Sequence, residues 1–266
     1  MGEINYRPLI EDMVWSFSRV SAYGQCPRRW YLRYIRKCPE AEKFFASYGT
    51  FMHELIEGYY NGAIAKDELP AVFLRDFQKR VRGRRPKSAT LKKFIDGAVN
   101  YLKSFQPFPY KMIAVEQKVE FSVEGFKFLG FLDFLGCDET DGELVLIDNK
   151  SRDLRHRSGR EKPTVKDREL DEMLRQLYVY CVAVEQNYGR LPKALCFNCF
   201  RTGTFIYEPF SREAYEEAKQ WVVAQIHTIM DDGDFDPIPN PFACYWICGV
   251  SDHCEYAPET WHYRRR

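Results

Sequence analysis

Hydrophobic residues recur at helical spacing through the N-terminal part of the chain. Residues 15–37 are predicted to be helical, with serine residues near the start as candidate N-caps and a possible break at Cys26-Pro27. A second helix is expected over residues 41–62, followed by a polar, basic helical region that reaches about residue 105. The chain therefore begins with a predicted helical region.

Apolar and polar residues then begin to alternate, as they do in strands. Three strands are predicted over residues 112–123, 126–136 and 143–150, with tight turns at Glu124-Gly125 and Asp141-Gly142. The remaining elements are a helix, a hairpin of two strands and a last helix, over residues 168–187, 193–201, 204–209 and 211–232. This order predicts an α/β fold with a central mixed β-sheet flanked by helices.

The pattern divides the chain into three parts that we expect to form one compact unit. Residues 1–105 are the helical region, residues 106–232 the α/β core, and residues 233–266 a tail rich in proline, aromatic residues and cysteine. An apolar content of 45% with 16% aromatic residues is typical of an ordered globular protein.

The net charge of +1 predicts no strong field around the whole protein, but the basic residues are clustered. One cluster spans residues 80–87 and another lies between residues 152 and 166. A local basic groove can bind phosphates in a protein of nearly zero net charge. Each cluster taken alone is equally consistent with a solvated surface loop. The candidate DNA-binding residues are Arg152, Arg155, Arg157 and Arg160.

Two carboxylates are predicted to meet at one end of the sheet. Asp148 and Lys150 end the apolar run of residues 144–147, and alternation along a strand projects both side chains to the same side. Asp133 lies near the end of the neighbouring strand, so both carboxylates can converge on one ion. Oxygen ligands suit Mg²⁺ or Mn²⁺, which neutralise a phosphate and lower the pKa of bound water. The pattern predicts metal-dependent phosphodiester cleavage, in which Lys150 orients the water.

Each of these motifs is weak when it stands alone. Lys150 could be a surface lysine at a strand end, and His53 could be an ordinary helix histidine. Gln176 and Tyr180, four residues apart on a predicted helix, share a face but could be ordinary helix surface.

Their combination and order resemble the PD-(D/E)XK nuclease superfamily, and specifically its RecB-type branch. That branch has a helix histidine, then Gly-x-x-Asp, Asp-x-Lys and Gln-x-x-x-Tyr, and this chain has His53, Gly130 to Asp133, Asp148 to Lys150, and Gln176 to Tyr180. The resemblance implies a restriction-endonuclease-like core. It also implies a metal site and catalytic residues: metal ligands His53, Asp133, Asp148 and the Asn149 carbonyl, a catalytic Lys150, and Gln176 and Tyr180 positioning DNA or the lysine.

The chain contains nine cysteines, an odd number. Cys244, Cys248 and Cys254 are clustered in the tail, and with the distant Cys26 they could hold a [4Fe-4S] cluster or Zn²⁺. Alternatively, the three tail cysteines are simply buried apolar residues. Cys196 and Cys199 lie in a predicted strand and point to opposite faces, so we expect them to be structural, together with Cys38, Cys137 and Cys181.

The segment from Ser16 through Cys26-Pro27 to Trp30 resembles the N-terminal signature of iron–sulfur nucleases. These include the CRISPR-adaptation exonucleases and the AddB-type recombination nucleases, in which one early cysteine joins three late ones. The resemblance implies that Cys26, Cys244, Cys248 and Cys254 hold [4Fe-4S], with Zn²⁺ as the alternative.

These observations lead us to expect a DNA nuclease. It would be an exonuclease acting on single-stranded DNA or DNA ends in recombination, repair or CRISPR adaptation, with a CRISPR integrase or a recombination protein as possible partner. The alternative is a DNA-end-binding subunit of a larger complex that is inactive or is activated only by its partner. No signal peptide and no run of about 18 apolar residues is visible, so we expect a cytoplasmic protein with no membrane contact.

Overall fold

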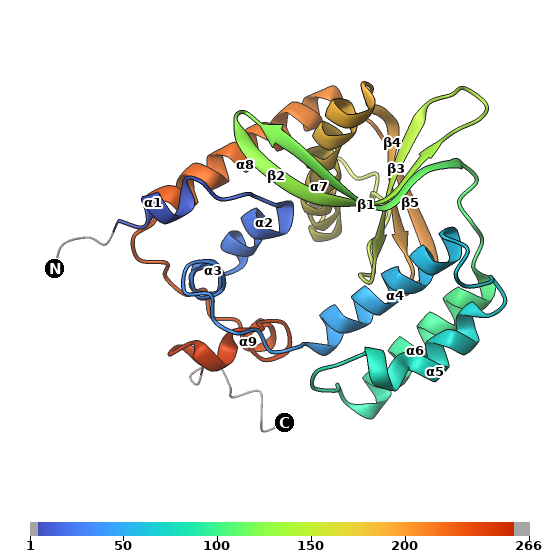
Figure 1. The fold of residues 1–266 in the computed structure, drawn as a ribbon, viewed down its shortest axis with the longest axis horizontal. Coiled ribbons are helices and arrows are strands. Elements are labelled where there is room, and N and C mark those ends of the chain that lie inside the picture. The colour runs from blue at the N-terminus through green and yellow to red at the C-terminus, as the bar shows by residue number, and fades with distance from the viewer. Residues whose placement is uncertain (1–4, 258–266) are drawn as a thin grey trace.

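A five-stranded sheet forms the centre of the computed structural model, which describes residues 5–257 (Figure 1). The strands follow chain order across the sheet, β1 to β5. Only β3 and β4 are parallel, whereas the other neighbours are antiparallel. The strands are β1 (Lys111–Val123), β2 (Phe126–Cys137), β3 (Leu144–Lys150), β4 (Pro192–Cys199) and β5 (Thr204–Pro209). The predicted α/β fold with a mixed sheet is confirmed.

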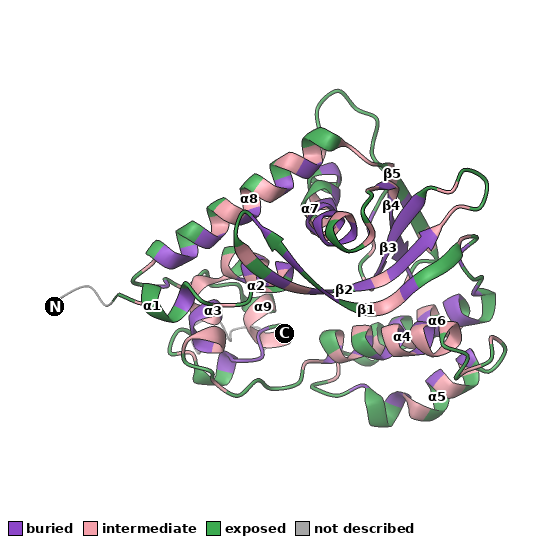
Figure 2. Ribbon diagram, turned by 45° about the horizontal axis from the view of Figure 1, so that its top comes forward, coloured by how far each residue is buried: buried purple, intermediate pink, exposed green. Residues whose placement is uncertain are grey.

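The parallel pair exists because helix α7 (Val165–Tyr188) connects β3 to β4 across one face of the sheet. A capping box between Thr164 and Asp167 begins this helix, and Gly189 ends it with a φ of 73°. Its buried residues pack on the sheet, as Figure 2 shows. A long buried helix is thereby fixed beside the carboxyl end of β3.

The first helical stretch is two helices rather than one. Helix α2 (Phe17–Gln25) ends at Cys26, where the backbone is extended, and α3 (Pro27–Tyr34) begins immediately afterwards. The Cys26 sulfur accepts a hydrogen bond from the Arg29 amide and so caps α3. Proline at the first position of α3 lacks the amide that α2 would need to continue, which explains the break.

The N-terminal helices share the main core with the C-terminal part of the chain. Trp30 stacks on Phe235, and both are buried in the same cluster as Cys248. The other elements of this region are α1 (Arg7–Ile10), α8 (Arg212–Asp231), α9 (Pro241–Trp246) and the 3₁₀ turn η1 (Ser251–His253).

Three further helices form a second cluster beside the sheet: α4 (Phe44–Tyr60), α5 (Leu69–Arg80) and α6 (Ser88–Ser104). Tyr60 of α4 packs on Phe134, Val145 and Ile147, on the other side of the sheet from the residues that contact α7. The sheet is therefore covered on both faces, and α4 and α7 lie on opposite sides of it. Cys196 and Cys199 belong to different clusters, which confirms that they point to opposite faces.

Candidate active site

The ladder between β2 and β3 ends where the predicted acidic residues begin. Its last pair is Phe134 with Ile147, so the next pair in register would be Asp133 with Asp148. Instead of another backbone bond, the Asp133 carboxylate accepts the Asn149 amide at 2.7 Å. The two strands separate at this point, and the carboxylates of adjacent strands meet there as predicted.

Sequence analysis missed a third carboxylate, Glu116 of β1. Val115 pairs with Phe134 and Gln117 with Leu132, so Glu116 lies directly across from Asp133. Glu116 has a φ of 42°, which a residue with a side chain rarely adopts, and such strain is typically retained at functional sites. The turn at residues 124–125 was the signal that could have revealed it, because counting back from that turn pairs position 116 with 133.

His53 of α4 lies against this acidic pair. Its Nδ1 is 2.9 Å from Glu116 Oε1 and 3.6 Å from Asp133 Oδ2, and its Nε2 is 3.0 Å from the Asn149 carbonyl oxygen. His53, Glu116 and Asp133 each offer one ligand atom within 4.8 Å of the others. The predicted histidine, aspartate and carbonyl therefore come together, with Glu116 added.

Lys150 and Asp148 form a second group on the α7 side. Lys150 Nζ lies 2.6 Å from Asp148 Oδ2 and donates a 2.9 Å hydrogen bond to Gln176 Oε1. The Gln176 amide also donates to Asp148 Oδ1 at 3.4 Å. The predicted alternation is confirmed, since Asp148 and Lys150 meet the same side chain of α7. Gln176 thus fixes the lysine beside the aspartate.

Tyr180, one turn after Gln176, lies over Gly130 of β2. A β-carbon at position 130 would approach the tyrosine ring to 2.8 Å. Burial raises the pKa of the Tyr180 hydroxyl far above its ordinary value, and the negative charge of Asp148 adds to the rise. The tyrosine therefore stays protonated.

The charges of the site suit a divalent cation. Burial raises the pKa of Asp133 well above its usual range, and the charge of Asp148 raises it further. Burial opposes protonation of His53, but Glu116 and Asp133 outweigh it and raise its pKa to about 9. Asp148 Oδ2 is buried, and the Lys150 ammonium lies 2.6 Å from it. Three buried or half-buried carboxylates gathered in one place fit a metal ion.

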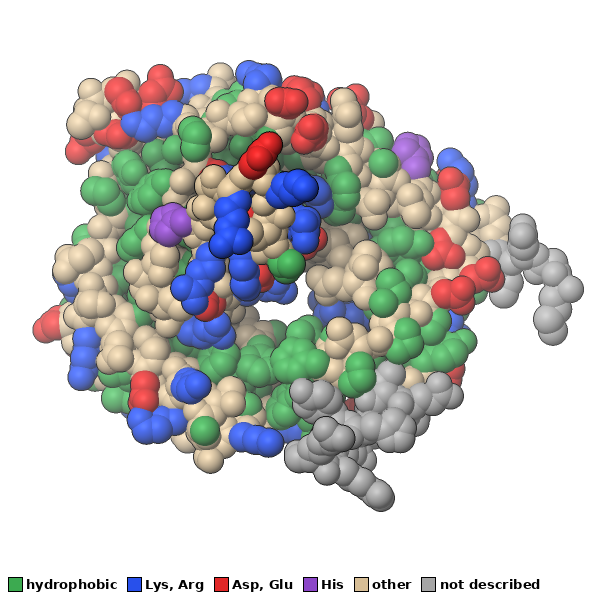
Figure 3. All heavy atoms as spheres, turned by 180° about the vertical axis from the view of Figure 1, so that it is seen from behind, with side chains coloured by type: hydrophobic (Ala, Val, Ile, Leu, Met, Phe, Trp, Pro, Cys, Tyr) green, Lys and Arg blue, Asp and Glu red, His purple; other side chains and the backbone are tan. Residues whose placement is uncertain are grey.

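The arginine-rich loop lies between β3 and α7. Arg157 is held by Asp171 at 2.8 Å and Glu208 at 2.7 Å, and Arg155 by Asp153 at 3.0 Å. Arg152 lies 3.9 Å from Glu169, and the side chain of Arg160 forms no ion pair with any residue in the described part of the chain. All four are exposed, but Arg157 is neutralised by its two partners. Figure 3 shows the molecule from behind the view of Figure 1, with Lys and Arg side chains gathered beside a hollow near the centre of the picture.

The structure brings the four predicted ligand cysteines into one region. Burial raises the pKa of the Cys248 thiol, and charges on Cys244 and Cys26 act in the same direction. Burial likewise raises the pKa of Cys254, again with a contribution from Cys26. Within residues 5–257 no three of these sulfurs lie within 4.8 Å of one another. Tetrahedral zinc with bonds of about 2.3 Å requires sulfurs about 3.8 Å apart.

Comparison with known proteins gives a family match over most of the chain. The model for the PD-(D/E)XK nuclease superfamily matches residues 14–258. A crystal structure from Eubacterium rectale, named as a candidate exonuclease, superposes with a TM-score of 0.51 at 14% identity. That match covers 95% of this chain and 92% of the other and shows a shared fold. No curated protein matches the sequence. Among the described residues, no helix is long and apolar enough to cross a membrane.

Proposed function

Because the chain belongs to the PD-(D/E)XK nuclease superfamily, we propose that it is a deoxyribonuclease that uses Mg²⁺ or Mn²⁺ to hydrolyse phosphodiester bonds. One observation carries the proposal: His53, Glu116 and Asp133 converge beside the carboxyl end of β3, next to a buried Lys150–Asp148 pair. Carboxylates and a lysine around one strand end supply the groups that metal-dependent hydrolysis needs.

The order of the motifs supports assignment to the RecB-type branch. His53 lies on a helix before the sheet, Gly130 and Asp133 on β2, and Asp148 and Lys150 on β3. Gln176 and Tyr180 follow on α7, where they contact Lys150 and Gly130. The last motif of that branch thus has a physical role, because it fixes the lysine and packs on the glycine.

A divalent ion bound by His53, Asp133, Asp148 and the Asn149 carbonyl would neutralise the phosphate and lower the pKa of a water molecule. Glu116 joins this ligand set, since its carboxylate lies 2.9 Å from the histidine ring. Imidazole and carboxylate together suit Mn²⁺ as well as Mg²⁺.

Lys150 acts on the water or the phosphate. Its ammonium group has three protons: Gln176 Oε1 accepts one, and Asp148 Oδ2 lies 2.6 Å from the nitrogen as an ion-pair partner. The proton that remains can orient the attacking water or stabilise charge on a phosphate oxygen. Tyr180 holds Gly130 and thereby β2 in place, and does not exchange a proton.

We propose that the substrate is single-stranded DNA or a DNA end, cleaved in exonuclease mode. Arg152, Arg155 and Arg160 are exposed on the loop that follows the catalytic strand, where they can contact phosphates. Arg157 contributes mainly by holding the loop to Asp171 and Glu208. Recombination, repair and CRISPR adaptation are the proposed settings, with a CRISPR integrase or a recombination protein as partner.

We also propose that Cys26, Cys244, Cys248 and Cys254 hold a [4Fe-4S] cluster, with Zn²⁺ as the alternative. Cys26 lies within electrostatic range of Cys248 and Cys254, so thiols from the start of α3 and from the C-terminal tail lie near one another. Four thiolates are a ligand set that a [4Fe-4S] cluster or a zinc ion accepts. When bound, such a group would supply a structural clip.

The alternative function is a DNA-end-binding subunit that is inactive or needs its partner for activity. The buried Lys150–Asp148 pair argues against an inactive site, because a buried ion pair adds little net stability after its desolvation cost, so a catalytic role accounts for it better than stability does.

The test is cleavage of end-labelled single-stranded and duplex DNA by anaerobically purified protein with Mg²⁺, Mn²⁺ or chelator. Metal-dependent cleavage that disappears in Lys150→Ala supports the nuclease, and the product ladder gives its polarity. If wild-type protein binds DNA but does not cleave it under any condition, the alternative is correct.

A further inference from the structure

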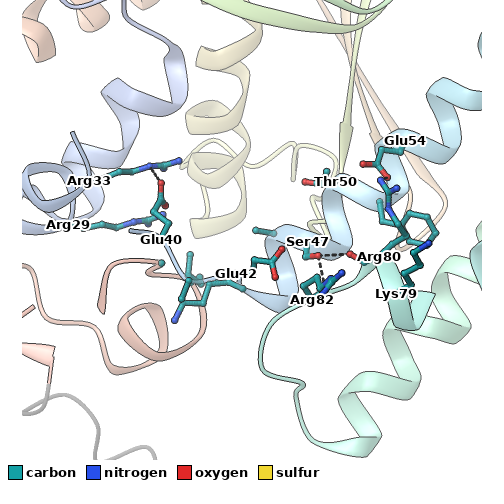
Figure 4. A pocket seen from close by; sticks show the side chains of 16 residues that line it. Arg29, Arg33, Glu40, Glu42, Ser47, Thr50, Glu54, Lys79, Arg80 and Arg82 are labelled. Atoms are coloured by element: carbon teal, nitrogen blue, oxygen red, sulfur yellow. Dashed lines mark hydrogen bonds and ion pairs between the residues drawn. The ribbon is translucent and has the colours of Figure 1, made fainter. Parts of the chain in front are cut away.

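A polar pocket of about 630 Å³ lies along α4, on the side that faces the N-terminal helices and the tail. Figure 4 shows its three walls: Arg29 and Arg33 from α3, Ser47, Thr50 and Glu54 from α4, and Lys79, Arg80 and Arg82 from the end of α5. Ile247 and Gly249 of the tail complete it. The proposed mechanism uses none of these residues.

The charge of the pocket is strongly biased. Six basic side chains line it, against three acidic ones. Arg33 is paired with Glu40 at 2.6 Å and Arg80 with Glu54, which occupies two of the three carboxylates. Among the described residues, Arg29, Lys43, Lys79 and Arg82 have no ion pair, and Glu42 is the one further carboxylate of the lining; Lys43 is hydrogen-bonded to Tyr245 and Ser251 of the tail. This excess of positive charge favours an anionic occupant.

The wall formed by the end of α5 is rigidly attached to α4. Ser47 accepts the Arg82 amide at 2.8 Å and donates to the Arg80 carbonyl at 3.0 Å. Gly83, with a φ of 88°, lies so close that a β-carbon would be 2.6 Å from the Glu42 carbonyl oxygen. The side chains of Lys79 and Arg82 are exposed, but they start from this fixed backbone and line the pocket.

The opposite wall holds a buried donor without a partner. Arg29 Nε is buried and donates no hydrogen bond, although another nitrogen of the same guanidinium donates to Gln25 at 3.1 Å. A buried N–H without an acceptor costs free energy that a phosphate oxygen would recover.

The pocket and the candidate active site share helix α4. Thr50 precedes His53 by less than one turn, and Ser47 precedes it by six residues, which is about 9 Å along the helix axis. A strand stacked as in a duplex, at a rise of about 3.4 Å per nucleotide, covers that distance in about three nucleotides, and a more extended single strand covers it in fewer. A strand whose scissile phosphate lies beside His53 can therefore place a neighbouring phosphate in the pocket.

We propose that this pocket binds backbone phosphates of the DNA strand, about one to three nucleotides from the scissile bond, with Lys79 and Arg82 as its principal contacts. The inference rests on the proposed function and adds a second point of contact to it. Arg29 contributes from the opposite wall. It is unsuitable for the test because its charge acts on Cys248, so its loss would disturb the cysteine region.

The test uses Lys79→Ala combined with Arg82→Ala, and compares it with Lys93→Ala combined with Lys111→Ala. The control removes the same charge from exposed positions outside the pocket. Binding of fluorescein-labelled 20-nucleotide oligothymidylate is measured with Ca²⁺ at several salt concentrations. The pocket variant should bind at least tenfold more weakly, and the slope of log affinity against log salt should fall by about 1.4, since each lost single-strand contact contributes about 0.7. The control should match the wild type.

Neutral methylphosphonate linkages locate the contact. A block of three is moved stepwise along the oligonucleotide, and the wild type should lose affinity most when the block covers the linkages about one to three nucleotides from the cleavage position. The pocket variant should lose this position-dependent penalty. If it shows the same penalty as the wild type, or an unchanged salt slope, the pocket does not bind the strand. If the wild type cleaves DNA, the proposed nuclease function stands whether or not the pocket binds the strand. A wild type that neither binds nor cleaves DNA overturns both the nuclease function and the pocket proposal.

Discussion

Gly130 and Tyr180 are in direct contact across the interface between β2 and α7. A β-carbon on Gly130 would lie 2.8 Å from Cε1 of Tyr180, closer than two carbon atoms can approach. Gly130 precedes Asp133 by three residues, and Tyr180 follows Gln176 by four, so the contact joins the strand of the metal ligands to the helix that holds Lys150. The contact between Gly130 and Tyr180 thus accounts for the spacing in two motifs, Gly-x-x-Asp on β2 and Gln-x-x-x-Tyr on α7.

Substitution Gly130→Ala should displace the Tyr180 ring and with it the relation between Asp133 and Lys150. Overpacking of this kind costs about 1–3 kcal/mol of the free energy of unfolding. We expect a lower midpoint in denaturant and a lower kcat. Adding Tyr180→Leu should restore stability without restoring full activity. If Gly130→Ala alone is as stable and active as the wild type, the contact does not constrain the site.

The sequence predicted the fold and most of the site because these depend on local patterns. Alternation gives the strands, and the antiparallel turns place Asp133 next to Asp148. Glu116 was not predicted as a site residue because no motif includes it. Its position across from Asp133 follows only from counting the register of the long β1–β2 hairpin. Its positive φ is also invisible to propensity, since that conformation is imposed by the surrounding sheet.

The arginine loop shows what sequence cannot supply. The clustered charges were visible, but the carboxylates that pair with Arg157 come from α7 and β5, Asp171 and Glu208. The pocket along α4 was also hidden, because its walls come from α3, α5 and the tail and meet only after folding. Long-range packing decides which charges remain available.

Glu116 should show a trade-off between stability and activity. Glycine adopts a φ of 42° without strain, so Glu116→Gly should relieve part of a strain of about 1–3 kcal/mol. Glu116→Gln removes the charge but keeps the strained backbone. Both variants should lose metal affinity, measured by calorimetry with Mn²⁺, whereas only the glycine variant should resist unfolding better in chelator. Equal stability of the two would show that the backbone stores no strain.

Gln176→Ala should lower kcat much more than metal affinity, because Gln176 contacts Lys150 and only one of the proposed ligands, Asp148, and none of the His53 group. Misplacing a catalytic group by about 1 Å can cost about 100-fold in rate. Gln186→Ala is the matched control on the same helix, since Gln186 bonds the backbone of Ser122 instead. The rate of single-turnover cleavage is measured for both variants and should fall only in Gln176→Ala. A normal rate for Gln176→Ala would show that Gln176 does not position Lys150.

Asp167 should make the arginine loop sensitive to acid. Its carboxylate accepts hydrogen bonds from Ser158 and from the Thr164 amide, and these bonds hold its pKa well below the usual range. A lowered folded-state pKa stabilises the fold above the unfolded value of about 3.9, and this stabilisation is lost as pH falls toward the folded value. Asp167→Asn should therefore lower the melting temperature at pH 6 and have less effect near pH 3. An equal fall in melting temperature at pH 6 and near pH 3 would mean that the ionised carboxylate of Asp167 is not responsible for the stabilisation.

The cysteine assignment is decided by Cys26→Ser, because Cys26 caps α3 and is the N-terminal member of the proposed set. If the four cysteines hold [4Fe-4S], anaerobically purified wild type should be brown and contain iron, and the variant should lose both. Serine can replace the cap on the Arg29 amide, so the loss reports on the ligand rather than on the helix start. Cys38→Ser is the control, since Cys38 lies on the same side of the core but outside the set. Zinc in place of iron would identify the alternative metal, and full iron content in Cys26→Ser would exclude Cys26 as a ligand.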